Sequence, residues 1–177
     1  MNKMDFAENK LPHKLFINAC DILEKKVAPP WECHIHSKYT DGKASSSEIF
    51  DVSIRKKLEI IIFTEHTEPW RFEDTSWYQR YYQEIDKFRK IHSDSVQAFI
   101  GIESSAVTFD GGLDATDEML NTAEFILGAV HRYPEIGNQR VQDLKSNTAI
   151  DLEYQTLVGL SMNQNVDAVA HIGATCS

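Results

Sequence analysis

The chain has 177 residues, a length that suits one domain built around a single hydrophobic core. Hydrophobic residues make up 42% and charged residues 25%, as in an ordinary folded soluble protein, while a net charge of -9 argues against a general surface for nucleic acids or anionic membranes. No apolar run is long enough to cross a bilayer and the N-terminal residues lack the apolar core of a secretory signal, so we expect no membrane association and a cytoplasmic location. Three cysteines without a CxxC pair predict neither a disulfide framework nor a cysteine zinc knuckle.

The first predicted elements alternate between helix and strand. Apolar residues at helical spacing over residues 11–26 predict an amphipathic helix, which two following prolines end. A short strand over about 32–37 comes next. Ser45 with Glu48 three residues later fits a capping box, which predicts a helix from there to about residue 57.

The rest of the chain continues this alternation. Residues 58–66 form an almost continuous apolar, β-branched run, typical of a parallel strand that is covered on both faces. Helices are predicted at 76–93, 116–122 and 148–164, and strands at 97–103, 124–131 and 166–173. Strands separated by helices predict an α/β fold with a parallel sheet, either open or closed into a barrel.

Histidines and one glutamate follow the predicted strands at their carboxyl ends. These ends converge on one rim of a parallel sheet, where functional sites are built. The candidates are His34, His36, His66, Glu103, His131 and His171, which include five of the seven histidines. Because residues two apart on a strand point the same way, His34 and His36 are expected to face the interior, and Cys33 and Ile35 the helix-covered side.

Each of these residues also has a simpler interpretation. The His34–His36 pair fits a solvated strand face, Asp41-Gly42 fits a plain turn, and a single histidine fits a core or loop position. Glu103, however, follows an apolar run, where an unpaired carboxylate is costly and a cation is an economical partner. Imidazoles and carboxylates on one rim together predict a site for divalent ions, and Glu103 has two oxygens with which to bridge two metals roughly 3.5–4 Å apart. The expected chemistry is hydrolysis.

Five short motifs occur in a fixed order between residues 31 and 173. They are His34–Gly42 with the pattern HxHS..TDG, Thr64-Glu65-His66, Gly101-Ile102-Glu103, Gly128-Ala129-Val130-His131 and Ala170-His171-Ile172-Gly173. In this order they resemble the PHP family, the polymerase and histidinol phosphatase domain of metal-dependent phosphoesterases, although the family usually has Asp at the position of Glu65. The resemblance implies one domain with a distorted (β/α)7 TIM-like barrel over 31–173 and a helical N-terminal extension over 1–30.

The resemblance further implies up to three divalent metal ions, of zinc, manganese or iron. His34, His36 and Glu103 would hold the first. Glu103, His131 and His171 would hold the second, and Asp41 with His66 would contribute to the third.

The implied activity is hydrolysis of a small phosphomonoester by a hydroxide that bridges the metals. Arg132, beside His131, either stabilises the equatorial phosphoryl oxygens or is a solvated surface residue. Glu65 and Glu68 either orient a histidine or are solvated loop charges. The aromatic residues between 70 and 82 either pack a helix or form a wall over the substrate.

One family motif, an Asp-x-His near the C-terminus, has no counterpart before Ser177. In relatives its Asp completes the shell of the first metal and its His that of the third. With about five recognisable strands, the barrel is expected to be truncated and to expose a strand edge. Either a homo-oligomer covers this edge or activity is impaired, and the second case makes a non-catalytic metal-binding subunit the alternative function. An amidohydrolase-like enzyme is a third interpretation, which the Gly-Ile-Glu motif disfavours.

Overall fold

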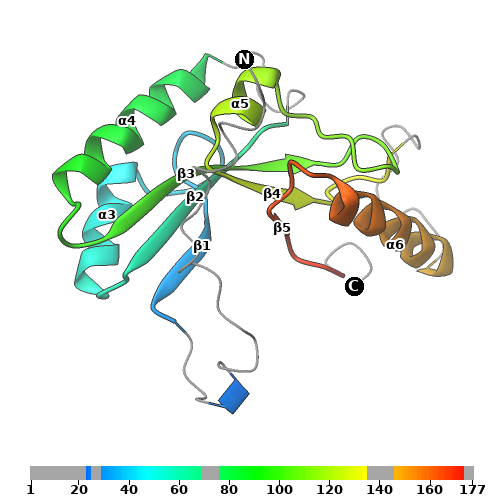
Figure 1. The fold of residues 1–177 in the computed structure, drawn as a ribbon, viewed down its shortest axis with the longest axis horizontal. Coiled ribbons are helices and arrows are strands. Elements are labelled where there is room, and N and C mark those ends of the chain that lie inside the picture. Colours follow the sequence, from blue (N-terminus) through cyan, green and yellow to red (C-terminus); the bar gives the residue numbers. More distant parts are fainter. Residues whose placement is uncertain (1–22, 25–28, 69–75, 135–145, 174–177) are drawn as a thin grey trace.

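The computed structural model describes residues 23–24, 29–68, 76–134 and 146–173, and within them the fold centres on one curled parallel sheet (Figure 1). Its strands are β1 (Trp31–Ile35), β2 (Ile60–His66), β3 (Gln97–Ser105), β4 (Phe125–Ala129) and β5 (Ala168–Val169). They lie in the order β1-β2-β3-β4-β5, and every neighbouring pair is parallel. The predicted α/β class, with strands arranged as in a TIM-like barrel, is thereby confirmed for these five strands.

Four helices connect the strands: α3 (Ser46–Arg55), α4 (Trp77–Ile91), α5 (Asp117–Thr122) and α6 (Ser146–Met162). The predicted capping box is confirmed, since the Ser45 side chain accepts from the Glu48 N–H while the Glu48 carboxylate accepts from the Ser45 N–H. The predicted start of α6 at Thr148 was two residues late. The helix predicted at 11–26 lies outside the described residues except at 23–24, which are helical.

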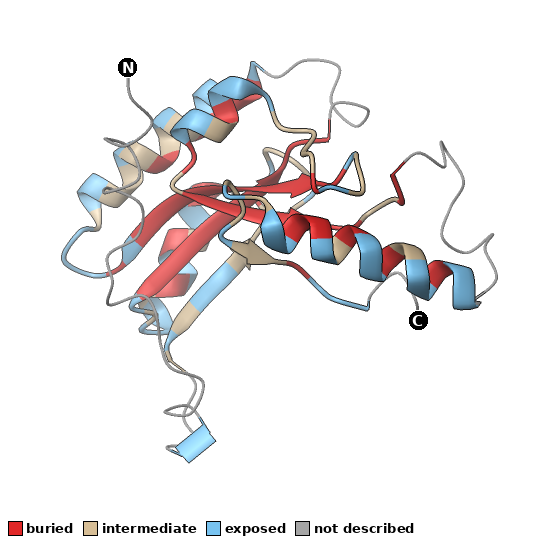
Figure 2. Ribbon diagram, turned by 45° about the vertical axis from the view of Figure 1, so that its right-hand side comes forward, coloured by how far each residue is buried: buried red, intermediate tan, exposed pale blue. Residues whose placement is uncertain are grey.

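The central strands β2, β3 and β4 are buried on both faces of the sheet, as Figure 2 shows. All seven residues of β2 are buried, which confirms the strand predicted from its apolar run. Ile61 and Phe63 pack with α3, α4 and α5, whereas Ile60 and Ile62 belong to a separate cluster on the opposite, concave face. The predicted helix packing of the aromatic residues is confirmed for Trp77, Tyr78 and Tyr81, which lie in the core; Trp70 lies outside the described residues.

Strand β1 departs from simple alternation. Its register against β2 shifts between Glu32 and Ile35, so that Trp31 packs in the concave cluster while Ile35 packs on the helix side. A bulge of this kind re-aims the side chains that follow it. Cys33 is exposed, so its predicted placement under the helices was wrong. His34 and His36 face the interior as predicted, because both rings lie against Glu103.

None of the helices in the described part of the chain combines the length and the apolar character that a bilayer span requires.

Candidate metal centre

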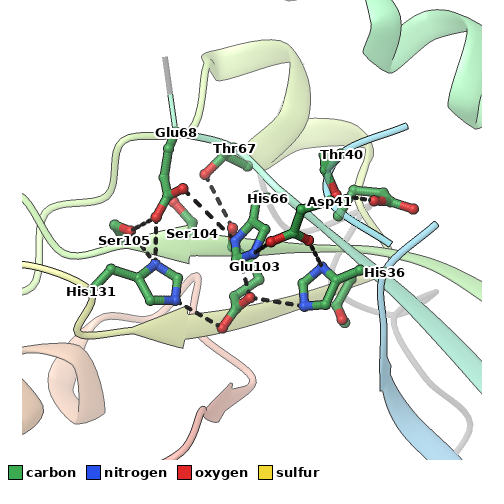
Figure 3. A network of polar contacts seen from close by, with 12 residues as sticks. His36, Thr40, Asp41, His66, Thr67, Glu68, Glu103, Ser104, Ser105 and His131 are labelled. Carbon is green, nitrogen blue, oxygen red and sulfur yellow. Dashed lines mark hydrogen bonds and ion pairs between the residues drawn. The ribbon is translucent and has the colours of Figure 1, made fainter. Parts of the chain in front are cut away.

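The candidate ligands converge on Glu103, which lies in the central strand β3 and is only 1% exposed. Its Oε1 lies 2.8 Å from His171 Nε2 and 3.3 Å from His131 Nε2. Its Oε2 lies 3.2 Å from His34 Nε2, from His36 Nε2 and from His66 Nδ1. Figure 3 shows this carboxylate between His36, His66 and His131.

The local structure explains why Glu103 can lie so deep. Gly101 precedes it on the same face, and a Cβ there would lie 2.6 Å from the Phe63 carbonyl oxygen and 2.7 Å from that of Phe125. The glycine therefore lets both neighbouring strands approach β3 closely. The Tyr81 hydroxyl donates to the Gly101 carbonyl at 2.8 Å from the helix side.

The spacing of the nitrogen atoms fits a shared cation better than hydrogen bonds alone. A carboxylate oxygen accepts about two hydrogen bonds, yet three ring nitrogens surround Glu103 Oε2. His34 Nε2 and His36 Nε2 also lie 3.0 Å apart, so their lone pairs converge. Ligand atoms bound to one ion at about 2.0–2.1 Å lie about 3 Å from one another, and imidazole with carboxylate suits zinc, manganese or iron. The residues present fit divalent metal ions.

Four groups of side chains have ligand atoms within 4.8 Å of one another in the described part of the chain. Three of them bring together the sets named from sequence, with His36 added to the third. The groups are His34, His36 and Glu103; Glu103, His131 and His171; His36, Asp41 and His66; and His66, Glu68 and His131. The fourth group was not predicted. That any of these residues ligates a metal stays a prediction.

Asp41 reaches the centre from the turn after β1, where it is 45% exposed. Its Oδ2 lies 3.4 Å from His66 Nε2, and its Oδ1 lies 4.0 Å from His36 Nδ1. The turn folds back on the strand so tightly that a Cβ on Gly42 would lie 2.1 Å from the His36 carbonyl oxygen. Glycine is therefore required beside Asp41.

Glu65 holds this turn in place. Its fully buried carboxylate accepts from the Ser37 N–H at 2.8 Å and from the Thr40 hydroxyl. Burial raises the pKa of Glu65, against these hydrogen bonds. Glu65 is thus not a solvated loop charge, and none of the described histidines is hydrogen-bonded to it. Its hydrogen bonds instead fix the loop that carries Asp41.

The electrostatics follow from one buried carboxylate among five imidazoles. Burial alone would raise the pKa of Glu103, but hydrogen bonds from His131 and His171 outweigh it and hold that pKa far below its usual range. Burial would likewise lower the pKa of His131, but hydrogen bonds to Glu103 and Glu68 raise it to about 9. For His66, burial prevails over Glu103 and lowers the pKa, which favours the neutral, ligating form.

Two basic side chains near the centre have other surroundings. Arg132 is half-buried directly after His131, and its role in catalysis stays a prediction. Lys38 is exposed and lies 3.5 Å from the Glu48 carboxylate, at the start of α3.

The strand ends were predicted only in part. Glu103 does not end β3, which runs on to Ser105, and His131 and His171 each follow their strand by two residues. His171 has a positive φ of 26°, so the chain turns sharply where it enters the centre.

Sequence reasoning missed Asp114, which anchors the end of β3. Its Oδ1 accepts from the Thr67 hydroxyl at 2.5 Å, the Ser104 hydroxyl at 2.8 Å and the Ser105 N–H at 3.0 Å. Burial raises the pKa of Asp114 against these hydrogen bonds. A single acidic residue in a loop belongs to no repeating sequence pattern, so Asp114 could not be recognised from its neighbours. The only indication in the sequence was the pair Ser104 and Ser105 at the end of β3, whose polar groups need a hydrogen-bond partner.

The chain is similar to known proteins in both its sequence and its fold. A family model described as the PHP domain matches residues 32–176. Among solved structures, the chain is similar to histidinol phosphate phosphatase from Lactococcus lactis subsp. lactis Il1403, whose crystal structure contains zinc, L-histidinol and phosphate. The TM-score is 0.64 at 20% identity over 82% of this chain, and the match spans 58% of the other chain. None of the curated proteins gives a significant match.

Proposed function

The chain belongs to the PHP domain family, and from this premise we propose that it is a metal-dependent phosphoesterase that hydrolyses a small phosphomonoester. The observation that carries the proposal is the convergence of five imidazoles on the single buried carboxylate of Glu103. The similarity in fold to a phosphatase whose crystal structure contains zinc and phosphate supports the same class of reaction.

Three groups of residues would hold the divalent ions. His34, His36 and Glu103 would hold one, Glu103, His131 and His171 a second, and Asp41 with His66 a third. Such ions lower the pKa of a bound water and neutralise the oxygens of a phosphoryl group.

The residues of the chain itself supply charge, shape and access. Glu103 stays ionised because its pKa lies far below its usual range, so it offers both oxygens to neighbouring groups. Buried apolar side chains such as Phe99 and Leu127 fill the concave face next to Glu103 and exclude water from that side of the carboxylate. His34 and His171, each 34% exposed, leave the rim open to a phosphate ester. Arg132 is our candidate for binding the equatorial phosphoryl oxygens.

The test is hydrolysis of p-nitrophenyl phosphate and of histidinol phosphate by the purified chain with added zinc or manganese. We expect metal-dependent turnover that Glu103→Gln abolishes. The exposed Glu59, at the other end of β2, gives a matched control, and Glu59→Gln should retain full activity. Bound metal without any metal-dependent turnover would contradict the proposal and favour the non-catalytic metal-binding alternative.

A further inference from the structure

One buried acid of the centre has no part in the chemistry proposed above. Glu68 lies two residues beyond β2 and is 1% exposed. Its Oε1 lies 2.6 Å from His131 Nδ1 and 3.0 Å from the Ser105 hydroxyl. The same hydroxyl oxygen lies 2.7 Å from His131 Nδ1, so the three groups form a compact triangle (Figure 3).

The hydrogen atoms in this triangle can be assigned from its chemistry. An ionised carboxylate only accepts hydrogen bonds, so His131 Nδ1 must carry the hydrogen that points toward Glu68. Ser105 donates its hydroxyl hydrogen to Glu68, and its oxygen lies beside the same Nδ1–H. In the neutral ring this leaves the lone pair on Nε2, which faces Glu103 Oε1 at 3.3 Å.

We propose that Glu68, supported by Ser105, is a positioning residue that holds His131 in the Nδ1–H tautomer and so presents its Nε2 to a metal ion. The inference rests on the proposed function in one respect, because it assumes a divalent ion at the group of Glu103, His131 and His171. A carboxylate behind a ligating imidazole fixes the ring's orientation and raises its basicity.

The main alternative is that Glu68 is itself a ligand, in the group with His66 and His131. An ion there would need His131 Nδ1, which already lies 2.6 Å from Glu68 and 2.7 Å from Ser105. The 2.6 Å distance suits a hydrogen bond to a charged group and is short for two ligands of one ion. Glu68 Oε2 lies 4.0 Å from His66 Nδ1, which is too long for a hydrogen bond, so the imidazole that Glu68 orients is His131 and not His66. The geometry therefore favours positioning over ligation.

The first test uses the unmodified chain loaded with zinc and labelled with 15N-histidine. Long-range 1H–15N correlation spectra report which ring nitrogen carries hydrogen and which binds metal. We expect His131 to be protonated at Nδ1 and bound through Nε2. Zinc binding through Nδ1, or a chain that binds no zinc, would overturn the inference.

The second test measures zinc affinity and stoichiometry by competition with a chelator. Glu68→Ala should weaken zinc binding by about 10–100-fold without changing the number of ions bound at saturation. Glu68→Gln keeps an acceptor but loses the charge, and Ser105→Ala removes only the support, so both should have smaller effects. Glu59→Gln should match the unmodified chain.

Two results of this second test would overturn the inference. Unchanged affinity in Glu68→Ala would mean that Glu68 does not support His131. Loss of one ion at saturation, with the other affinities intact, would mean that Glu68 is a ligand. If Glu68→Ala fails to fold by circular dichroism, the tautomer measurement decides. A chain that binds zinc through His131 Nε2 but hydrolyses no ester contradicts the proposed function and leaves this inference standing.

Discussion

The pH dependence of stability offers a quantitative test of the site's electrostatics in the metal-free chain. His131 has an ordinary pKa of 6.5, which its hydrogen bonds to Glu103 and Glu68 raise to about 9 against the effect of burial. A raised pKa means that the folded state binds this proton more tightly than the unfolded state does. The resulting stability is fully present below pH 6.5 and is lost as the pH rises through about 9. At about 1.4 kcal/mol per pH unit, the loss amounts to roughly 3 kcal/mol.

The assay is urea unfolding at pH values from 6.5 to 9.5 in the presence of a chelator, followed by circular dichroism. The free energy of unfolding should fall steadily across this range. In Glu68→Gln the fall should be smaller, because one of the two carboxylates that raise the pKa of His131 has lost its charge. The reasoning is refuted if the free energy of unfolding is constant or increases between these pH values, or if Glu68→Gln shows the same fall.

Three further predictions concern single positions. Glu103→Gln removes the carboxylate that two groups of candidate ligands share. Zinc affinity should therefore fall by more than about 100-fold, which is the upper end of the effect of losing a residue that only supports a ligand. An unchanged zinc content by elemental analysis would count against the site. Gly101→Ala would place a Cβ 2.6 Å from a carbonyl oxygen of the neighbouring strand, which should lower the free energy of unfolding by about 1–3 kcal/mol; a melting temperature equal to that of the unmodified chain would contradict this. The Ser45 N–H and hydroxyl lower the pKa of Glu48 to about 2, so the capping of α3 is present above pH 4.5 and is lost as the pH falls through about 2. Carboxyl NMR titration should show this value and a rise toward 4.5 in Ser45→Ala, and a normal value in the unmodified chain would disprove the cap.

The elements that could be predicted from sequence are those in which local pattern and tertiary context agree. The run Ile60–Phe63 is apolar at every position because helices cover one face of β2 and the concave cluster covers the other. The bulge after Glu32 has no such signal, because a single extra residue in β1 changes the register with β2 without changing the composition of either strand. Strict alternation therefore predicted Cys33 under the helices, whereas it is exposed.

The candidate site divides in a similar way. Histidines that follow buried strands are conspicuous in the sequence, since a parallel sheet brings all such ends to one rim. Glu68 and Asp114 could not be assigned in advance because their partners come from distant elements: Glu68 meets Ser105 and His131, and Asp114 meets Thr67. Only the fold decides which of several loop acids is buried beside a ring nitrogen.

The curl of the sheet explains why residues from its two outermost described strands can belong to one centre. In a flat sheet, β1 and β5 would be separated by four strand spacings, or about 19 Å. The rings of His34, on β1, and His171, just after β5, nevertheless lie with centroids 5.8 Å apart, and both contact Glu103. Two imidazole side chains cannot bridge the flat-sheet distance, so the strands must curve around β3, where Gly101 permits the close approach. The candidate metal centre is thus a consequence of the barrel-like curvature, and any substitution that flattens the sheet at β3 should separate His34 from His171 before it disturbs the neighbouring pair of His36 and His66.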